Sequence, residues 1–345
     1  MLTRAFTKPR NSPSSKRDDE NSCRSVSIYE YEDCIFGFMD LDVPLSFCDE
    51  DDDNDGGGGG GLSLRELLRG SVGVIGEGSL GITEKVVLLE RRVWAVKRFG
   101  KVIVRRGEFG RRIERLAQVS RKCQYLVPIT AYLYAKRIKF VVCDYYPMGS
   151  LADLLAGARE LGHTTLDWKQ RLIIILNIAR AIAFIHSQSP PQDKRLQLNV
   201  HGDIKASNIM INVDFTACLS DYGFTQLAKR VEVSDTWHRK PPPPSPEHIY
   251  SDTLSQTSDI CNFGIIMLDM LGGPKAPSLR KCIVEKIEDI KNGVCEFFEF
   301  SVEGKEKNQA SQVLDIALAC TDSSSDARPS MEKILSNLGN IISRR

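Results

Sequence analysis

The chain has 345 residues and is 42% hydrophobic, enough to bury a sizeable core in one large domain or two lobes. The net charge of +1 is unevenly divided, because residues 1–61 hold 6 Lys/Arg and 14 Asp/Glu whereas residues 62–345 hold 40 and 31. The ten cysteines form no Cys-x-x-Cys pair, which argues against a zinc site or disulfide framework and favours reduced, buried thiols. The best apolar run, residues 171–184, is too short for a membrane span and contains Asn177 and Arg180.

The first 61 residues are predicted to lie outside the folded domain. Residues 48–61 are a run of acidic residues followed by six glycines, a composition typical of a flexible linker. Residues 28–47 alternate acidic with aromatic and aliphatic residues, which suits either a docking segment that orders on a partner or unstructured chain. The basic, Ser-rich residues 1–17 favour a disordered tail over an organelle transit peptide. The charge division predicts that this acidic tail contacts the basic body or a basic partner.

Order is predicted to begin at residues 62–68, where Ser63 and Glu66 form a capping-box pattern for a short helix. A strand that enters a glycine turn is predicted at 71–81, and strand-like alternation follows at 84–89, 92–99 and 139–146. A helical period occurs at 108–120, and helical patterns dominate later, at 151–156, 167–187, 257–272, 279–291, 308–320 and 330–342. A small sheet-rich half with one helix therefore precedes a larger helical half.

A glycine-rich turn lies between the first two strand patterns. Gly76, Gly78 and Gly81 form Gly-x-Gly-x-x-Gly, and Lys97 follows sixteen residues after the last glycine, within a strand. The setting between two strands differs from the strand-to-helix turn of a dinucleotide fold. A lysine on a strand beneath such a turn can reach the α- and β-phosphates of a nucleotide. The alternative, an ordinary surface lysine, is disfavoured by the apolar neighbours of Lys97.

Four polar side chains downstream complete a phosphate-handling pattern. Asp203, Lys205 and Asn208 lie within residues 201–208, and Asp221 follows in "LSDYGF". Asn208 and Asp221 supply the hard oxygen ligands that Mg²⁺ prefers. Asp203 is placed to accept a hydroxyl proton, and Lys205 could steady a migrating phosphoryl group.

Residues 63–345 resemble a protein kinase domain along their whole length. Segments 67–81, 143–157, 166–186 and 220–227 resemble plant receptor-like kinases of the leucine-rich-repeat class, many of which are described as inactive. The resemblance implies an α+β bilobal kinase fold, with an N-lobe at 62–143 and a C-lobe at 144–345. It also implies ATP and Mg²⁺ as cofactors, with a nucleotide site that includes Gly76, Gly78, Gly81, Ala95, Lys97, Asp144, Tyr145, Asn208 and Asp221. Three further residues have structural roles implied by the family: Glu247 pairs with Arg328, and Asp259 holds the catalytic-loop backbone.

Three departures from the kinase pattern bear on activity. Gly202 replaces an Arg that reads a phosphate on the activation segment, which removes a regulatory input and leaves the chemical groups intact. Arg112 stands where the family has a Glu that pairs with Lys97, so repulsion is expected to misplace the lysine and lower the rate. Glu108 is one turn earlier on the same helix face, and Glu114 is expected to face away.

The third departure is a run of four prolines at 241–244, where a kinase builds its shelf for the substrate peptide. Proline removes backbone donors and imposes an extended course. The run is interpreted as a stiff loop or, alternatively, as a docking motif. Either way the usual shelf is expected to be impaired.

These features predict an ATP-binding signalling protein of the kinase fold that has weak or no phosphotransfer activity and acts as a scaffold or allosteric partner. Two alternatives remain: an active Ser/Thr kinase that uses Asp203 as its base, with Lys205 as the second catalytic residue, and an interaction module that binds no nucleotide. The expected partners are other signalling proteins, including membrane receptor kinases, and not nucleic acid. Because no membrane span is apparent, we expect a cytoplasmic location, with the plasma-membrane periphery reached through partners.

Overall fold

The computed structural model describes residues 67, 70–88, 92–135, 138–162, 166–189, 196–229 and 254–343. The chain divides into two compact units. The first, here called the sheet unit, comprises Met1–Val119, Pro128–Tyr145 and Leu227–Val233; the second, the helical unit, comprises Ser120–Val127, Tyr146–Gln226 and Ser234–Arg345. Among the described residues, no helix has both the length and the apolar character needed to cross a membrane.

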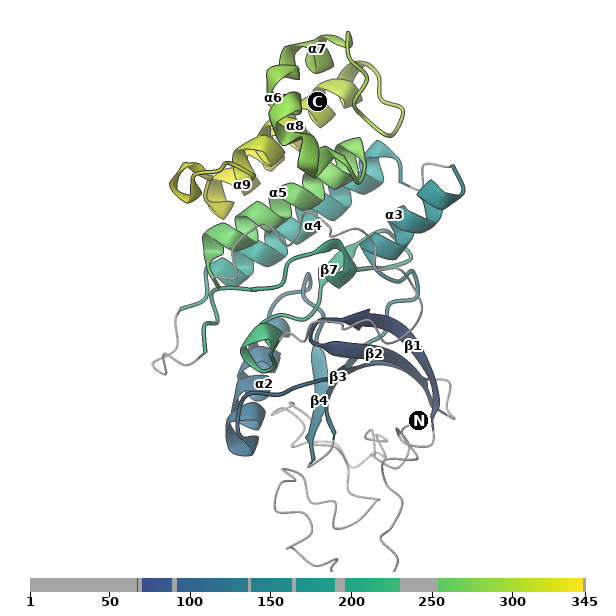
Figure 1. Ribbon diagram of the computed structural model, residues 1–345, viewed down its shortest axis with the longest axis vertical. Coiled ribbons are helices and arrows are strands. Elements are labelled where there is room, and N and C mark those ends of the chain that lie inside the picture. Colours follow the sequence, from purple (N-terminus) through teal and green to yellow (C-terminus); the bar gives the residue numbers. More distant parts are fainter. Residues whose placement is uncertain are drawn as a thin grey trace, which may run out of the picture. The chain divides into compact units, whose positions relative to one another are not determined.

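The sheet unit is built on five antiparallel strands in the order β1-β2-β3-β5-β4 (Figure 1). Three of them match the expected strand patterns closely, since β-branched and aromatic residues alternate with polar ones. The fourth strand in sequence was not predicted, because a bulge between Ile129 and Ala131 interrupts its alternation. The strands are β1 (Ser71–Gly78), β2 (Gly81–Val87), β3 (Val93–Phe99), β4 (Ile129–Tyr134) and β5 (Lys139–Asp144).

One helix, α2 (Arg106–Ser120), covers one face of this sheet. Its buried Phe109 makes edge or tilted ring contacts with Phe99 on β3 and with Tyr132 and Tyr134 on β4, at centroid separations of 5.3–6.1 Å. Directly paired residues of neighbouring strands point to the same face. Lys97 pairs with Val141, which pairs with Tyr132, so the lysine lies on the face that α2 covers.

The opposite face of the sheet carries a separate apolar core. It contains Leu67, the described helical residue that precedes β1, together with buried side chains of β2 to β5, namely Val86, Val96, Ala131, Leu133, Phe140 and Val142. The predicted capping box at Ser63 and Glu66 lies outside the described residues. The helical state and burial of Leu67 agree with a short helix that begins the domain.

The helical unit contains two long helices, α4 and α5, that lie side by side (Figure 1). Serine and aspartate begin several helices by accepting a backbone N–H: Ser150 and Asp167 form capping boxes with Asp153 and Gln170, and Ser255 caps α5. The α-helices are α3 (Leu151–Glu160), α4 (Trp168–His186), α5 (Gln256–Gly272), α6 (Arg280–Glu285), α7 (Ile287–Asn292), α8 (Gly304–Cys320) and α9 (Met331–Ser343).

Short elements between α4 and α5 position the catalytic-loop residues. They are the 3-10 helices η3 (Ala206–Asn208) and η4 (Phe224–Gln226) and the two-stranded hairpin β6 (Ile209–Ile211) and β7 (Ala217–Leu219). Two further 3-10 helices are η6 (Ala276–Leu279) and η7 (Ser325–Ala327). The single helix expected over 279–291 is wrong in detail, because the backbone leaves helical geometry at Lys286 (φ −104°, ψ 12°) and separates α6 from α7.

Candidate functional site

The catalytic-loop residues converge on one carboxylate oxygen of Asp203. The Lys205 ammonium lies 2.9 Å from Asp203 Oδ2, and the Asn208 side-chain amide donates to the same oxygen at 3.0 Å and to the Asp203 carbonyl at 2.8 Å. Asp203 and Asn208 are buried, and η3 brings the three residues together over a single turn. The spacing of these residues in the sequence therefore produces the predicted cluster.

His201 and Asp259 hold the backbone of this loop. Asp259 accepts the backbone N–H groups of His201 and Gly202 at 2.8 and 3.0 Å, which confirms its expected structural role. The His201 ring donates from Nε2 to the Ser220 carbonyl at 2.8 Å and accepts the Asp203 N–H at Nδ1. These two contacts fix a neutral tautomer. Complete burial lowers the pKa of His201, outweighing the nearby carboxylates that raise it.

The two predicted metal ligands lie on consecutive parts of the chain joined by the β6–β7 hairpin. Ser220, next to Asp221, donates both its backbone N–H and its hydroxyl to the Asn208 carbonyl, at 2.8 and 3.1 Å. Because Asn208 Nδ2 donates to Asp203, the oxygen of the same amide, Oδ1, is the atom that can bind a metal. Asp221 has a left-handed backbone (φ 62°), a conformation that is uncommon for non-glycine residues, although aspartate adopts it more readily than most. An amide oxygen and a carboxylate are a donor set that fits Mg²⁺.

Gly202 occupies a position that no other residue fills without strain. Its φ is +82°, and a Cβ atom there would lie 2.3 Å from Leu254 Cδ2 and 2.8 Å from Thr225 Oγ1. The arginine that the kinase pattern places here would therefore collide with both side chains. Leu254 and Thr225 therefore occupy the space that the side chain of an arginine at this position would need.

The predicted glycine turn is the β1–β2 hairpin. Gly76 and Gly78 lie on β1, and Gly81 begins β2. Gly81 has φ +139°, and a Cβ there would lie 2.0 Å from the Arg98 carbonyl oxygen on β3. Only glycine permits this close approach of the two strands. Near Gly76 and Gly78 a Cβ would meet only Thr83 and Gly81, at 3.9 and 4.0 Å.

The other predicted nucleotide residues of the sheet unit lie on β3 and at the end of β5. Ala95 and Lys97 are on β3, and Asp144 is the last residue of β5, paired with Trp94. Partial desolvation raises the pKa of the Asp144 carboxyl, but its exposed surface limits the energetic weight of that effect. The Lys85 ammonium lies 4.5 Å from the centre of the Tyr145 ring, a cation–π contact.

The structure changes the expected role of the acidic residues of α2. The Arg112 guanidinium forms an ion pair with Glu108, one turn earlier, and only 13% of the Arg112 side chain is exposed. The predicted repulsion by Arg112 therefore needs correction, because Glu108 compensates its charge locally. Glu114 accepts the Tyr132 hydroxyl of β4 at 2.7 Å. The sequence spacing of Glu108 and Arg112 was the signal for their pair, since residues four apart share a helix face.

The predicted site residues are thus divided between the two units. Asp203, Lys205, Asn208 and Asp221 gather in the helical unit, and the three glycines, Ala95, Lys97, Asp144 and Tyr145 belong to the sheet unit. Ser220, which links Asn208 to the strand before Asp221, was not predicted, and nothing in its sequence context would have identified it. Glu247 and the proline run lie outside the described residues. Arg328 donates to the carbonyls of Thr257 and Asp322 at 3.0 and 2.9 Å.

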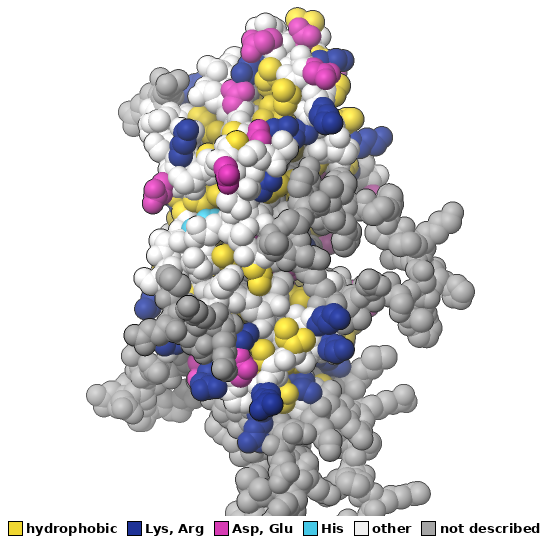
Figure 2. Space-filling view, turned by 60° about the vertical axis from the view of Figure 1, so that its left-hand side comes forward, with side chains coloured by type: hydrophobic (Ala, Val, Ile, Leu, Met, Phe, Trp, Pro, Cys, Tyr) yellow, Lys and Arg dark blue, Asp and Glu magenta, His cyan; other side chains and the backbone are white. Residues whose placement is uncertain are grey.

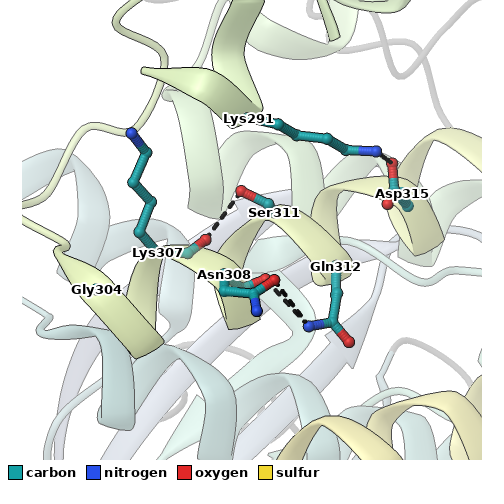
Figure 3. A pocket seen from close by; sticks show the side chains of 7 residues that line it. All are labelled: Lys291, Gly304, Lys307, Asn308, Ser311, Gln312 and Asp315. Atoms are coloured by element: carbon teal, nitrogen blue, oxygen red, sulfur yellow. Dashed lines mark hydrogen bonds and ion pairs between the residues drawn. The ribbon is translucent and has the colours of Figure 1, made fainter. Parts of the chain in front are cut away.

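A polar pocket of about 350 Å³ between α7 and α8 has none of the predicted site residues in its lining (Figure 3). Lys291 reaches into it from α7 but is paired with Asp315 at 2.9 Å. The Gln312 side chain donates to Asn308, and the Ser311 hydroxyl donates to the Lys307 carbonyl. Its polar groups are mostly satisfied by one another, so the pocket shows no arrangement for catalysis.

The comparison with known families agrees with this architecture. Residues 70–338 match the family described as protein kinase domain, and the chain therefore belongs to the protein kinase family. The Arabidopsis thaliana protein named Probable inactive receptor kinase At3g08680 is 32% identical over 293 residues. The match covers 81% of this chain and 44% of that protein, so the chain spans less than half the length of this relative.

Two solved structures share the fold. The pseudokinase domain of BIR2, described as an immune regulator of the RLK/Pelle family, superposes with a TM-score of 0.68 at 24% identity, over 88% of this chain and 91% of that one. The kinase domain of maize SIRK1 bound to AMP-PNP gives a TM-score of 0.64 at 22% identity, over 87% of this chain and 100% of that one. At these identities the similarity establishes the bilobal kinase fold alone.

Proposed function

We propose that the chain is a nucleotide-binding signalling module of the kinase fold whose phosphotransfer is weak or absent. The observation that carries this proposal is the coexistence of two features. The Asp203–Lys205–Asn208 cluster is assembled, whereas α2 carries Arg112, paired with Glu108, at the position where the family has a glutamate. The inactive status named for the Arabidopsis thaliana relative supports the same interpretation.

In this proposal each residue group has a distinct task. The glycine hairpin and Lys97 hold the phosphates of ATP, and Asn208 Oδ1 and the Asp221 carboxylate hold Mg²⁺. The bound metal would neutralise phosphate charge. Asp203 is the acceptor for a hydroxyl proton, and Lys205 positions its carboxylate. Because α2 carries Arg112 where the family has a glutamate, we expect phosphate transfer to be impaired more than nucleotide binding.

The second candidate is an active Ser/Thr kinase. The specific observation in its favour is that the loop is complete: Asp203, Lys205 and Asn208 are in contact, and Asp259 holds the backbone beneath them. For either candidate function, we propose that the partners are signalling proteins, including membrane receptor kinases, and that the location is cytoplasmic.

A thermal-shift titration of the full chain with ATP, with and without Mg²⁺, tests the proposal. We expect the melting temperature to rise with ATP and to rise further with Mg²⁺. Asp221→Asn should remove the additional rise in melting temperature that Mg²⁺ produces. Asp326→Asn removes the same charge at an exposed position and should leave that rise unchanged. Absence of any shift at millimolar ATP would contradict nucleotide binding.

Radiolabelled phosphate transfer, measured on the same samples, separates the two candidates. The signalling module is supported by a magnesium-dependent thermal shift together with no phosphate incorporation beyond the level that Asp203→Asn retains. Incorporation that depends on Asp203 supports the active kinase.

A further inference from the structure

A cluster of exposed cations surrounds the start of α2 in the sheet unit. It includes Lys101 and Arg105 before the helix, Arg106, Arg111 and Arg115 on the helix, and Lys229, all exposed. We call these six residues the basic surface. Figure 2, in which the left-hand side of the view in Figure 1 comes forward, shows dark-blue side chains on the sheet unit and others on the helical unit.

Tertiary structure adds Lys229 to this surface. The segment around Ala228 forms an antiparallel bridge with Val102, and the Lys229 backbone N–H donates to the Lys101 carbonyl at 2.8 Å. The two lysines are 128 positions apart in the chain but neighbours in the fold. Between Lys101 and Arg105, Ile103 is 58% exposed, so an apolar side chain stands within the cationic cluster.

Two acids of α2 lie near this surface, and both have other partners among the described residues. Glu108 pairs with Arg112, and Glu114 accepts the Tyr132 hydroxyl. Arg111 and Arg115 are one turn apart on α2, a like-charge spacing that destabilises a helix. Cations at the start of a helix also oppose its dipole. An acidic partner would relieve both effects.

The chain itself contains a segment of matching chemistry. Residues 28–55 hold 11 Asp/Glu and no Lys or Arg, with aromatic and aliphatic residues between the acids over 28–47. Six of the carboxylates fall within 49–55. From Arg106 to Arg115 the helix rises about 14 Å, a distance that four to five extended residues span. The acidic run at 49–55, which has seven residues, is therefore long enough to span the cationic row.

The connection between segment and surface is long enough for contact within one molecule. Asp55 lies twelve positions before Leu67, which is buried in the sheet unit. Such a glycine-rich linker has a mean span of roughly 17–21 Å and a maximum of about 40 Å. Because Leu67 lies on the sheet face opposite α2, the linker must pass around the sheet, and this reach allows it. Tethering raises the effective concentration of the segment to the millimolar range.

We propose that residues 28–55 dock on the basic surface, with carboxylates on its cations and an apolar residue of the segment on Ile103. Exposed pairs are individually weak and screened beyond about 8 Å at physiological salt. The contact therefore depends on many charges acting together and on the tether. It covers the outer side of α2, the helix that carries Arg112, and it does not depend on nucleotide binding.

Carbodiimide cross-linking of the full chain, which joins carboxylates to lysine amines, tests this contact. We expect cross-links from residues 28–55 to concentrate on Lys101 and Lys229 rather than on the exposed Lys275, Lys281 and Lys286 of the helical unit. In a variant with Arg105→Glu, Arg111→Glu and Arg115→Glu, these cross-links should fall by about tenfold. The matched triple variant with Lys275→Glu, Lys281→Glu and Lys286→Glu should retain them.

Equal labelling of lysines in both units, or unchanged cross-links in the arginine variant, would overturn the proposal. So would cross-links found only between chains when isotope-labelled and unlabelled protein are mixed, because a second copy would then be the occupant. A second measurement leaves the folded body unaltered: when the acids of 49–55 are replaced by Asn and Gln, acetylation of Lys101 and Lys229 should accelerate. An unchanged acetylation rate would contradict docking.

Discussion

Arg112 and Glu108 form an ion pair along one side of α2, with most of the arginine side chain withdrawn from solvent. Glu108 therefore compensates the charge of Arg112 within the same helix. Position 112 itself supplies no carboxylate, whereas the kinase pattern has a glutamate there. Residue 112 lies one turn from Phe109, which packs on β3 and β4, so a side chain at this position borders the face that holds Lys97.

Replacing Arg112 by glutamate is expected to raise phosphotransfer. The change supplies a carboxylate on the β3 side of α2 and can orient Lys97 toward phosphate, with a gain of about tenfold or more. Incorporation of labelled phosphate measures the effect, and Lys281→Glu, an exposed charge reversal on α6, serves as the control. An unchanged rate would place the main defect elsewhere in the chain.

Gly202 is expected to tolerate no side chain. Gly202→Ala forces alanine into a positive φ, at about 1–2 kcal/mol, and also into Leu254 and Thr225. Gly162 is the matched control, because its φ is +68° and nothing among the described residues lies within 4 Å of its added Cβ. Chemical unfolding should show Gly202→Ala to be more destabilising than Gly162→Ala by about 1–3 kcal/mol. Equal losses of unfolding free energy in the two variants would mean that the contact with Leu254 does not contribute to the destabilisation.

The buried His201 should make the fold sensitive to mild acid. Its pKa is lowered in the folded state, so below about pH 6.5 the unfolded chain binds a proton that the folded chain does not. Stability is therefore full above the unfolded pKa and declines as pH falls, by up to about 1.4 kcal/mol per pH unit. His201→Gln should flatten this slope between pH 6.5 and 5.5 in urea unfolding monitored by circular dichroism. Parallel slopes for the two proteins would refute this assignment.

Glu299 is expected to be a strong stabilising residue of the helical unit. Its carboxylate receives Arg171, which is almost fully buried, at 2.9 Å and Arg159 at 3.0 Å. Removing the acid leaves the Arg171 charge uncompensated in the interior, so Glu299→Gln should cost about 3 kcal/mol in the free energy of unfolding. The exposed Glu296→Gln should cost little. Similar unfolding midpoints for the two variants would show that Arg171 is compensated by backbone carbonyls alone.

The sequence by itself determined the features that depend on short-range spacing. Asp203, Lys205 and Asn208 lie within six residues, and one turn of η3 is enough to bring them into contact. Helix caps at Ser150 and Asp167 follow from the same local rule, since a cap and its N3 partner are three residues apart. Local backbone geometry is set by near neighbours, so features of this kind require no knowledge of the fold.

Only the tertiary structure decided the relationships that depend on packing. The closure of Leu254 over Gly202 and the placement of Lys229 beside Lys101 join residues far apart in the chain. Such pairs form because burying the core fixes which distant segments meet, and the energy of that burial is spread over many side chains rather than encoded at either partner.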